Sequence, residues 1–337
     1  MRRVAAIFAA LWVVLAHPAG AAPTLRSDPA WPRPLPAGWV LGEVSGVAVD
    51  AHDNVWLFHR PPKRRAGNGA PPVIEFDPAG RVIRAWGGKG VGYDWFENEH
   101  SIAVDSAGFV WLTGNGPHDG QVLEFTGDGR FVRQIGHPAS GAASRDTTHL
   151  GRPAGIAVDH AAHEVYVADG YANRRVIVFD TETGAFKRMW GGYGAPPDDS
   201  PHARRQFGHP VHCVHLARDG LVYVCDRQHD RVQIFHRDGS YVGEWRIAPA
   251  TRGLGSVWDL AFSPTDGEAT VIVADGSNER LRLLRRNDGA EVAAFGTRGS
   301  EPGAFRWVHS VAIDSHGRVF TGEVTGHRLQ RWLPATP

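Results

Sequence analysis

Three histidines occupy the same position in a phrase that recurs along the chain. His100 begins "HSIAVDSAGFVWLT", His212 begins "HCVHLARDGLVYVCD" and His309 begins "HSVAIDSHGRVFTGE". One such histidine alone is more often a polar rim residue, hydrogen-bonded to a loop, than a ligand. Three of them, with one coordination position left open, have the composition of a catalytic zinc site rather than of a closed structural one. We therefore predict a metal site, and the surrounding elements must bring these side chains together.

The recurring phrase predicts the fold. It consists of an alternating apolar run, a polar turn and a second apolar run, followed by a third and usually a fourth run, and its other three copies begin at Ser45, Ala154 and Trp258. The mature chain shows no long segment with apolar residues at helical spacing. Four short antiparallel strands, repeated six times at intervals near fifty residues, predict an all-β fold, a six-bladed β-propeller.

The last repeat is incomplete, which suggests how the ring closes. It has three runs and ends at "HRLQRWLP", whereas the segment 37–44, "AGWVLGEV", precedes the first repeat and resembles a fourth strand. We expect this N-terminal strand to complete the last blade and to hide its open edge. The propeller would then span residues 38–333, between a linker at 22–37 and a tail at 334–337.

The same ring would gather further polar residues at one mouth of its central channel. The first strand of each blade lines the channel, and alternate blades stand about 120° apart, so the three imidazoles can converge. Arg60 and Arg227 end the second run of their repeats, where a guanidinium could bind a carboxylate or pair with an acidic neighbour. Tyr171 directly follows the same position in the third repeat. A tyrosine beside a cation can act as a base, although exposed loop tyrosines are commonly packing residues.

These motifs together resemble one enzyme family. The phrases "AVDAHDNVWLFHR", "EHSIAVD", "VADGYANRRVIVF", "PVHCVHL", "VYVCDR" and "VHSVAID" are similar to those of the peptidyl-α-hydroxyglycine α-amidating lyases, over residues 38 to 333. The resemblance implies a six-bladed propeller of the NHL type that cleaves a C-terminal α-hydroxyglycine to a peptide amide and glyoxylate. It implies a zinc ion, Zn(2+), on the three histidines. By the same resemblance Arg60 would bind the substrate carboxylate, Tyr171 would be the base, and Arg227 matches a second functional arginine.

The resemblance also implies a structural calcium ion, Ca(2+), and here the chain departs from the family. The ion would be held partly by main-chain carbonyls, which correspond to those of Val47 and Ile102. The family has an acidic residue where this chain has Ser310, and calcium favours carboxylate oxygen. Trp307 replaces a methionine and would narrow the pocket.

The first residues and the two cysteines indicate the cellular location of the protein. Segment 1–21 has two arginines, an apolar core and a small-residue cleavage site, which predict a signal peptide. Its apolar core is shorter than the ~20 residues that a membrane-spanning helix needs. We expect a secreted or periplasmic protein without stable membrane insertion. In such an oxidising compartment Cys213 and Cys225 could form a disulfide or remain as two buried thiols.

Composition limits the partners, and the motifs leave three functions open. Lys and Arg together number 36, as do Asp and Glu. The sequence therefore shows no basic face of the kind that binds nucleic acid. We expect a monomer that acts on a small peptide or another α-hydroxyglycine-type substrate. The first function is a metal-dependent lyase on such a carbinolamide, and the second is a lactonase-like hydrolase that activates water at the same mouth. The third is a non-catalytic propeller that binds peptides or cell-wall material on a loop-rich face.

Overall fold

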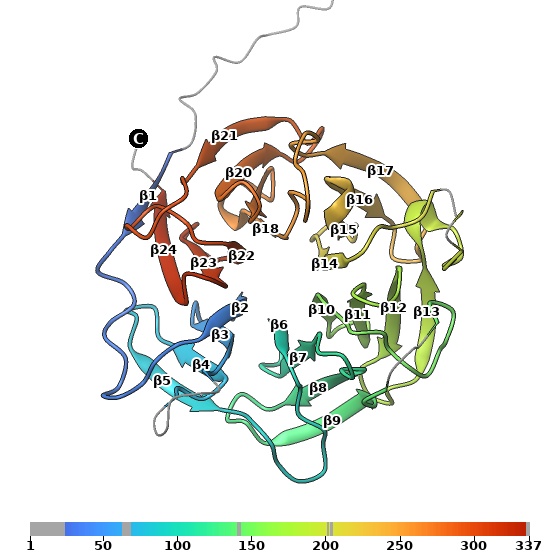
Figure 1. The fold of residues 1–337 in the computed structure, drawn as a ribbon, viewed down its shortest axis with the longest axis horizontal. Coiled ribbons are helices and arrows are strands. Elements are labelled where there is room, and N and C mark those ends of the chain that lie inside the picture. Colours follow the sequence, from blue (N-terminus) through green and yellow to red (C-terminus); the bar gives the residue numbers. More distant parts are fainter. Residues whose placement is uncertain (1–23, 63–68, 140–142, 201, 203–204, 335–337) are drawn as a thin grey trace, which may run out of the picture.

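The fold is a ring of six four-stranded antiparallel sheets around a central channel (Figure 1). The computed structural model describes residues 24–62, 69–139, 143–200, 202 and 205–334. The predicted six-bladed β-propeller is therefore confirmed. The predicted signal peptide, residues 1–21, lies outside the described residues, as do the last three residues of the predicted tail. Within the described part, no helix is both long and apolar enough to cross a bilayer.

Each blade has its first strand at the channel and its fourth at the rim. The first three blades contain β2 (Glu43–Val49), β3 (Val55–Arg60), β4 (Val73–Phe76) and β5 (Val82–Trp86); β6 (Glu99–Val104), β7 (Val110–Gly114), β8 (Gln121–Phe125) and β9 (Phe131–Gly136); β10 (Ile156–Asp159), β11 (Glu164–Asp169), β12 (Arg175–Asp180) and β13 (Phe186–Trp190). The next two contain β14 (Val211–Leu216), β15 (Val222–Asp226), β16 (Arg231–Phe235) and β17 (Tyr241–Arg246); β18 (Asp259–Phe262), β19 (Thr270–Asp275), β20 (Arg280–Arg285) and β21 (Glu291–Phe295). The last contains β22 (Val308–Ile313), β23 (Val319–Glu323), β24 (Arg328–Pro334) and β1 (Leu25–Asp28). The described loops contain three short 3-10 helices: η1 (Gly192–Gly194), η2 (Arg227–His229) and η3 (Pro264–Asp266).

An N-terminal strand closes the ring as predicted, but it is not the segment 37–44. The closing strand is β1, which pairs with β24 from Leu25 opposite Pro334 to Asp28 opposite Arg331. Segment 37–44 instead makes a single bridge, at Val40, and its end enters β2. Because β2 lies at the channel and a fourth strand lies at the rim, a segment that runs directly into β2 cannot also complete the last blade. The predicted linker at 22–37 therefore contains the closing strand.

Apolar side chains pack between neighbouring blades, and polar ones fix the turns. Trp56 and Phe58 of the first blade share a core cluster with Ile102 and Leu112 of the second. At the turn after each of these first strands, an aspartate accepts a hydrogen bond from a tryptophan of the second strand: Trp56 Nε1 to Asp50 Oδ2 at 3.0 Å, and Trp111 Nε1 to Asp105 Oδ2 at 3.1 Å. The period-two alternation of the sequence is thus the alternation between two inter-blade cores.

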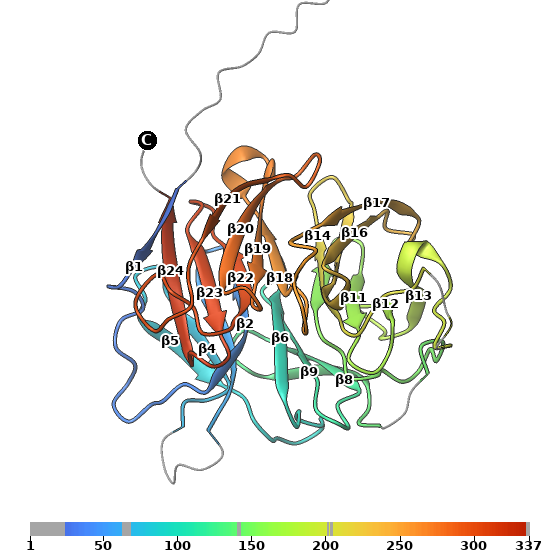
Figure 2. The same cartoon turned by 45° about the horizontal axis from the view of Figure 1, so that its top comes forward.

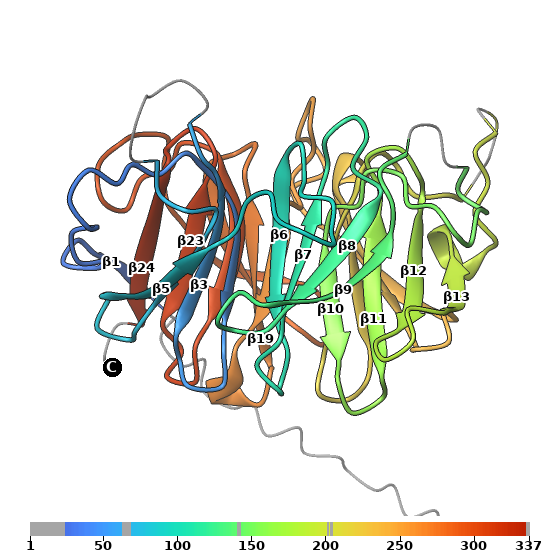
Figure 3. The ribbon, with the colours of Figure 1, turned by 90° about the horizontal axis from the view of Figure 1, so that it is seen from below.

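On the opposite face, buried carboxylates hold the loops that lead into the first strands. Asp226 Oδ2 pairs with Arg231 at 2.7 Å, and its Oδ1 accepts the Gly208 N–H at 2.8 Å. Glu323 does the same with Arg328 at 2.6 Å and the Arg306 N–H at 2.7 Å. These loops precede the strands that carry the channel histidines. Figures 2 and 3 show the blades standing side by side, with loops at both ends of their strands.

Candidate metal centre at the channel mouth

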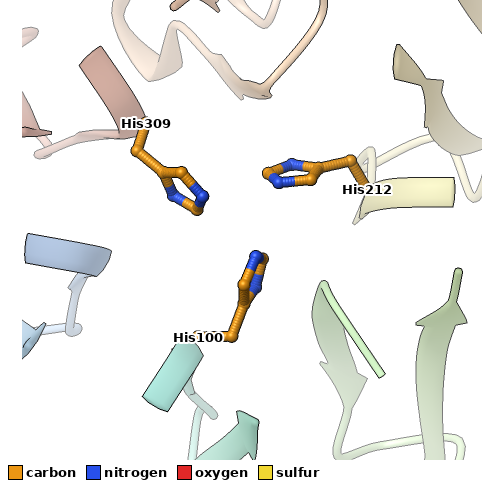
Figure 4. A group of neighbouring side chains, drawn as sticks. All are labelled: His100, His212 and His309. Carbon is orange, nitrogen blue, oxygen red and sulfur yellow. The ribbon is translucent and has the colours of Figure 1, made fainter. Parts of the chain in front are cut away.

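The three histidines converge on the channel axis from alternate blades (Figure 4). His100 lies on β6, His212 on β14 and His309 on β22. Each pair of ring centroids is 4.9 Å apart, and one nitrogen of each ring lies within 4.8 Å of the others. The side chains are at most 4% exposed. The structure brings the three predicted residues together, while their role as metal ligands stays a prediction.

Each histidine is held by the blade that follows it. The Nδ1 atom of His100 lies 3.2 Å from the Ala154 carbonyl oxygen, that of His212 lies 2.5 Å from Trp258 O, and that of His309 lies 2.7 Å from Ser45 O. A carbonyl only accepts, so each Nδ1 carries the hydrogen and donates it. Each Nε2 is then the unprotonated nitrogen with a lone pair, which is the tautomer that metal-binding histidines need.

Burial and positive neighbours keep these rings neutral. Burial lowers the pKa of His309 to about 3, with Arg60 and Arg227 adding to the effect. Burial likewise lowers the pKa of His100 and of His212 well below the ordinary value, and neighbouring histidines and arginines act in the same direction. Neutral imidazole is the form that coordinates a metal. The three donors therefore fit a zinc ion in number, tautomer and charge.

Tyr171 places its hydroxyl group at the histidines. The hydroxyl oxygen lies 3.1 Å from His100 Nε2 and 3.2 Å from His212 Nε2. The tyrosine follows β11 after Gly170, where a Cβ atom would lie 2.1 Å from the Val211 carbonyl oxygen. Only glycine allows this close approach of two backbones, which directs the next residue toward the channel.

Arg227 is a buried cation beside the tyrosine. Its side chain begins η2 and is 5% exposed, and its Nη1 donates to the Tyr171 hydroxyl at 3.4 Å. Its guanidinium carbon lies 4.0 Å from the ring centroid of Trp258, and its Nε donates to the Leu254 carbonyl at 2.9 Å. Burial lowers the pKa of Arg227. Among the described residues no carboxylate pairs with it, and a buried unpaired charge is costly, so the mouth favours an anionic ligand.

Arg60, by contrast, already has an acidic partner. Its Nη1 lies 2.6 Å from Glu43 Oε2, and its Nε donates to the Glu99 carbonyl at 2.8 Å. The Glu43 side chain is 42% exposed. The sequence left open whether each arginine pairs with an acidic neighbour or keeps its guanidinium for a carboxylate ligand. Arg60 forms an ion pair with Glu43, whereas Arg227 has no carboxylate partner among the described residues.

Below the histidines, the channel contains a second polar layer. A cavity of about 30 Å³ is lined here by Val47, Ile102, Asp259 and Ser310, among others, and Asp259 is the one carboxylate among its lining residues. Its Oδ2 accepts from Ser310 Oγ at 2.9 Å and from the Val311 N–H at 3.0 Å. Its Oδ1 lies 2.7 Å from His215 Nε2. The cavity has room for one ion or for a water or two. The calcium stays a prediction, and Asp259 is the carboxylate that lines this cavity.

Sequence reasoning missed three residues of this mouth and channel. Trp258 stacks on Arg227, Glu43 pairs with Arg60, and Asp259 supplies the carboxylate that position 310 lacks. Trp258 occupies the histidine position in the fifth repeat, and Asp259 occupies the Ser310 position there, so a comparison of neighbouring repeats could have found both. Trp307 packs edge-on against Trp258 with ring centroids 5.4 Å apart. The two cysteines form a disulfide between β14 and β15, directly after His212.

Known proteins with similar sequences include amidating enzymes. The chain is 28% identical over 333 residues to peptidyl-glycine alpha-amidating monooxygenase B of Xenopus laevis, across 92% of this chain and 36% of that protein. It is 25% identical over 310 residues to a probable peptidyl-alpha-hydroxyglycine alpha-amidating lyase of Caenorhabditis elegans, across 86% of this chain and 82% of that protein. The chain spans between 21% and 36% of the length of the monooxygenases it matches. No protein-family model matches it. The relatives confirm the resemblance that the motifs indicated.

Solved structures with the same fold include propeller lyases. A streptogramin B lyase superposes with a TM-score of 0.55 at 13% identity, over 93% of this chain and 98% of that one. A Bacteroides thetaiotaomicron protein of unknown function superposes with a TM-score of 0.59 at 15% identity, over 88% of this chain and 70% of that one. At these identities the likeness shows the fold alone.

Proposed function

We propose that this protein is a zinc-dependent lyase that cleaves the N–C bond of a peptidyl-α-hydroxyglycine, or of a similar carbinolamide, to an amide and glyoxylate. One observation carries the proposal: the Tyr171 hydroxyl lies within 3.2 Å of two neutral histidine nitrogens and 3.4 Å from an unpaired arginine. The relatives named as lyases support a lyase at the level of the family.

The reaction needs a base and a means of stabilising negative charge on oxygen. His100, His212 and His309 would hold the zinc ion, which supplies Lewis-acid chemistry at the substrate hydroxyl when bound. Tyr171 in its deprotonated form takes the hydroxyl proton, because its oxygen lies 3.1 Å from His100 Nε2 and 3.2 Å from His212 Nε2. The Arg227 guanidinium donates to the same oxygen through Nη1 at 3.4 Å.

The arginines orient the reacting carbon. Arg227 binds the carboxylate of the α-hydroxyglycine through its guanidinium, which has no carboxylate partner among the described residues, and Arg60 reaches the same group when it releases Glu43. A two-point hold on a planar carboxylate fixes the α-carbon relative to Tyr171, and this orientation contributes to the rate.

The bonds and protons balance without water. The electron pair of the broken O–H bond forms the aldehyde C=O of glyoxylate, and the C–N pair leaves on the amide nitrogen. The nitrogen takes one proton, so the proton that Tyr171 removed can be returned to the leaving amide. A hydrolase would instead consume one water for each turnover.

The decisive test is product formation from α-hydroxyhippurate by protein purified without chelator or histidine tag. We expect glyoxylate and benzamide in equal amounts, near-stoichiometric zinc by elemental analysis, and loss of activity on chelation with recovery on adding zinc. A zinc-loaded protein that releases no glyoxylate from any α-hydroxyglycine would overturn the proposal. Lactone opening by the same protein would then favour the hydrolase.

We also propose that the protein is exported. The Cys213–Cys225 disulfide suits an oxidising compartment. Cell fractionation with an antibody should find the protein in the periplasm or the medium, and its exclusive presence in the cytosol would contradict export.

A further inference from the structure

A second polar cavity lies between the third and fourth blades. It has a volume of about 450 Å³, and no carboxylate is among its lining residues. We call it the arginine pocket, defined by six of those residues: Arg174, Arg205, Arg231, Arg246, His209 and Tyr193. Its composition favours an anion.

Two of its arginines are neutralised and two are not. Arg231 pairs with Asp226 at 2.7 Å and with Glu244 at 3.1 Å, and Arg246 shares Glu244 at 3.0 Å. Arg174 and Arg205 have no carboxylate partner among the described residues. A further carboxylate, Asp199, is bonded to the Ser144 N–H at 2.8 Å and does not line the cavity. The pocket therefore keeps two guanidinium groups for a ligand.

The unpaired arginines are held in place by neutral groups. Arg174 Nε donates at 2.7 Å to His209 Nε2, whose ring donates through Nδ1 to the Gly170 carbonyl at 3.2 Å. Burial and Arg174 lower the pKa of His209, which keeps the ring a neutral acceptor. Arg205 lies over the Tyr193 ring, 4.7 Å from its centroid.

Tyr193 is a strained platform for this arrangement. Its backbone has a φ of 58°, and Arg205 has a φ of 60°, a region that side-chain-bearing residues seldom adopt. The Tyr193 N–H donates to Gln233 Oε1 at 2.9 Å. The guanidinium carbon of Arg231 also lies over the Tyr193 ring, 4.8 Å from its centroid. Strain of this kind persists where the surroundings over-determine it and gathers at ligand sites.

The pocket opens on the same face as the histidine site. His209 precedes β14, Arg174 precedes β12 and Arg246 ends β17, so all three lie at the end of the blades where the first strands begin. Only two residues separate His209 from His212, so their Cα atoms are at most ~11 Å apart. His209 also binds Gly170, the residue before Tyr171. A peptide whose end reacts at the histidines can therefore reach the pocket within a few residues.

We infer that the arginine pocket binds the side-chain carboxylate of an acidic residue one or two positions before the α-hydroxyglycine, so that the enzyme prefers acidic peptides. This inference rests on the proposed function, so binding and turnover are tested separately. A free inorganic anion offers the same chemistry, and the experiment distinguishes it.

Turnover is compared between isosteric substrates that differ in one charge. N-acetyl-Glu-α-hydroxyglycine and N-acetyl-Gln-α-hydroxyglycine are assayed, together with the pair that has one alanine inserted before the α-hydroxyglycine. For at least one pair we expect kcat/KM to favour Glu by about tenfold at low salt, since one charge-assisted hydrogen bond is gained. R174Q with R205Q should reduce this ratio to near one. R130Q, an exposed arginine in the turn between β8 and β9 on the opposite face, should leave the ratio unchanged.

Binding is measured by calorimetry with N-acetylglutamate methylamide, whose only carboxylate is the side chain, and with inorganic phosphate. Saturable binding of the glutamate probe that the double variant loses and R130Q keeps would support the inference. Binding of phosphate alone, or equal kcat/KM for both members of every pair, would overturn it. If no α-hydroxyglycine is turned over, the proposed function fails, and the binding data still decide what the pocket holds.

Discussion

The two layers of the central channel differ in how their polar groups are satisfied. In the upper layer three histidines donate through Nδ1 and leave Nε2 facing the axis, and Arg227 has no carboxylate partner among the described residues. In the lower layer both Ser310 and His215 bond to Asp259. The upper layer therefore keeps an unpaired guanidinium and three imidazole nitrogens at the channel axis, whereas the lower layer satisfies its carboxylate with neighbouring side chains and backbone. Replacements in the upper layer should therefore affect activity, and replacements in the lower layer should affect stability.

The largest expected effect is on catalysis. Tyr171→Phe removes the hydroxyl at the histidines, and we expect a fall in kcat of roughly 10²- to 10⁴-fold, the usual worth of a positioned base. The melting temperature and the zinc content should stay near those of the wild type. Tyr93→Phe, which removes a hydroxyl bonded to the Gly88 carbonyl outside the channel, is the matched control and should retain activity. Full activity in Tyr171→Phe would remove the tyrosine from the mechanism.

The next effect is a pH dependence of stability that arises from a histidine with both ring nitrogens hydrogen-bonded. His59 is buried, accepts the Gly42 N–H at Nδ1 (3.1 Å) and donates to the Pro71 carbonyl (3.0 Å), and burial lowers its pKa to about 4. Below about pH 6.5 the unfolded chain binds a proton that the folded chain refuses, so stability falls as the pH falls toward 4, by about 3 kcal/mol for this residue. Urea unfolding at pH 7, 5.5 and 4 measures the slope. His59→Gln should make it shallower, and an unchanged slope would contradict the assignment.

The third effect is a difference in kcat/KM between variants of the paired Arg60 and the unpaired Arg227. Arg227→Gln removes the unpaired guanidinium, and we expect kcat/KM to fall by about 10- to 100-fold, the worth of one or two charge-assisted hydrogen bonds. Arg60→Gln should cost less, because Arg60 already shares its charge with Glu43. Glu43→Gln frees Arg60 and should lower KM. Equal losses in the two arginine variants would show that the ion pair does not weaken Arg60.

The smallest effect should appear in the lower layer. Asp259→Asn turns one acceptor of Ser310 Oγ and the Val311 N–H into a donor, and we expect unfolding to become easier by about 1–3 kcal/mol. The kcat value should change little. Asp266→Asn, exposed in the same blade, is the control. Elemental analysis of wild type and variant also tests the calcium prediction, since calcium that disappears in Asp259→Asn would make this carboxylate its ligand.

Much of this architecture can be predicted from the sequence, because one repeat specifies one blade. The period-two runs and the recurring position of His100, His212 and His309 suffice to place the histidines around one axis. The closing strand is different, since "LRSD" at β1 is four residues long and carries no alternating pattern that distinguishes it from a linker. The prediction that segment 37–44 is the closing strand is therefore wrong, because this more regular segment looks more like a strand than β1 does.

Pairing across blades is what the sequence does not predict. Arg60 and Arg227 hold the same repeat position, yet one meets Glu43 and the other meets the Trp258 ring. The difference depends on side chains from neighbouring loops. Asp259 likewise acts on Ser310, the corresponding residue one blade further on. Such contacts become visible only when adjacent repeats are placed in space.

The pairing of β1 with β24 has a consequence for folding. Asp28 and Arg331 meet across 303 positions of the chain, so this pairing closes a loop that contains nearly the whole propeller. Contacts of such high separation are slow to form, because the entropy of closing the loop is lost before they stabilise anything. The three histidines reach their mutual distances only in the closed ring. A ligand that binds all three would therefore be linked thermodynamically to ring closure and would slow the opening of the propeller at its seam.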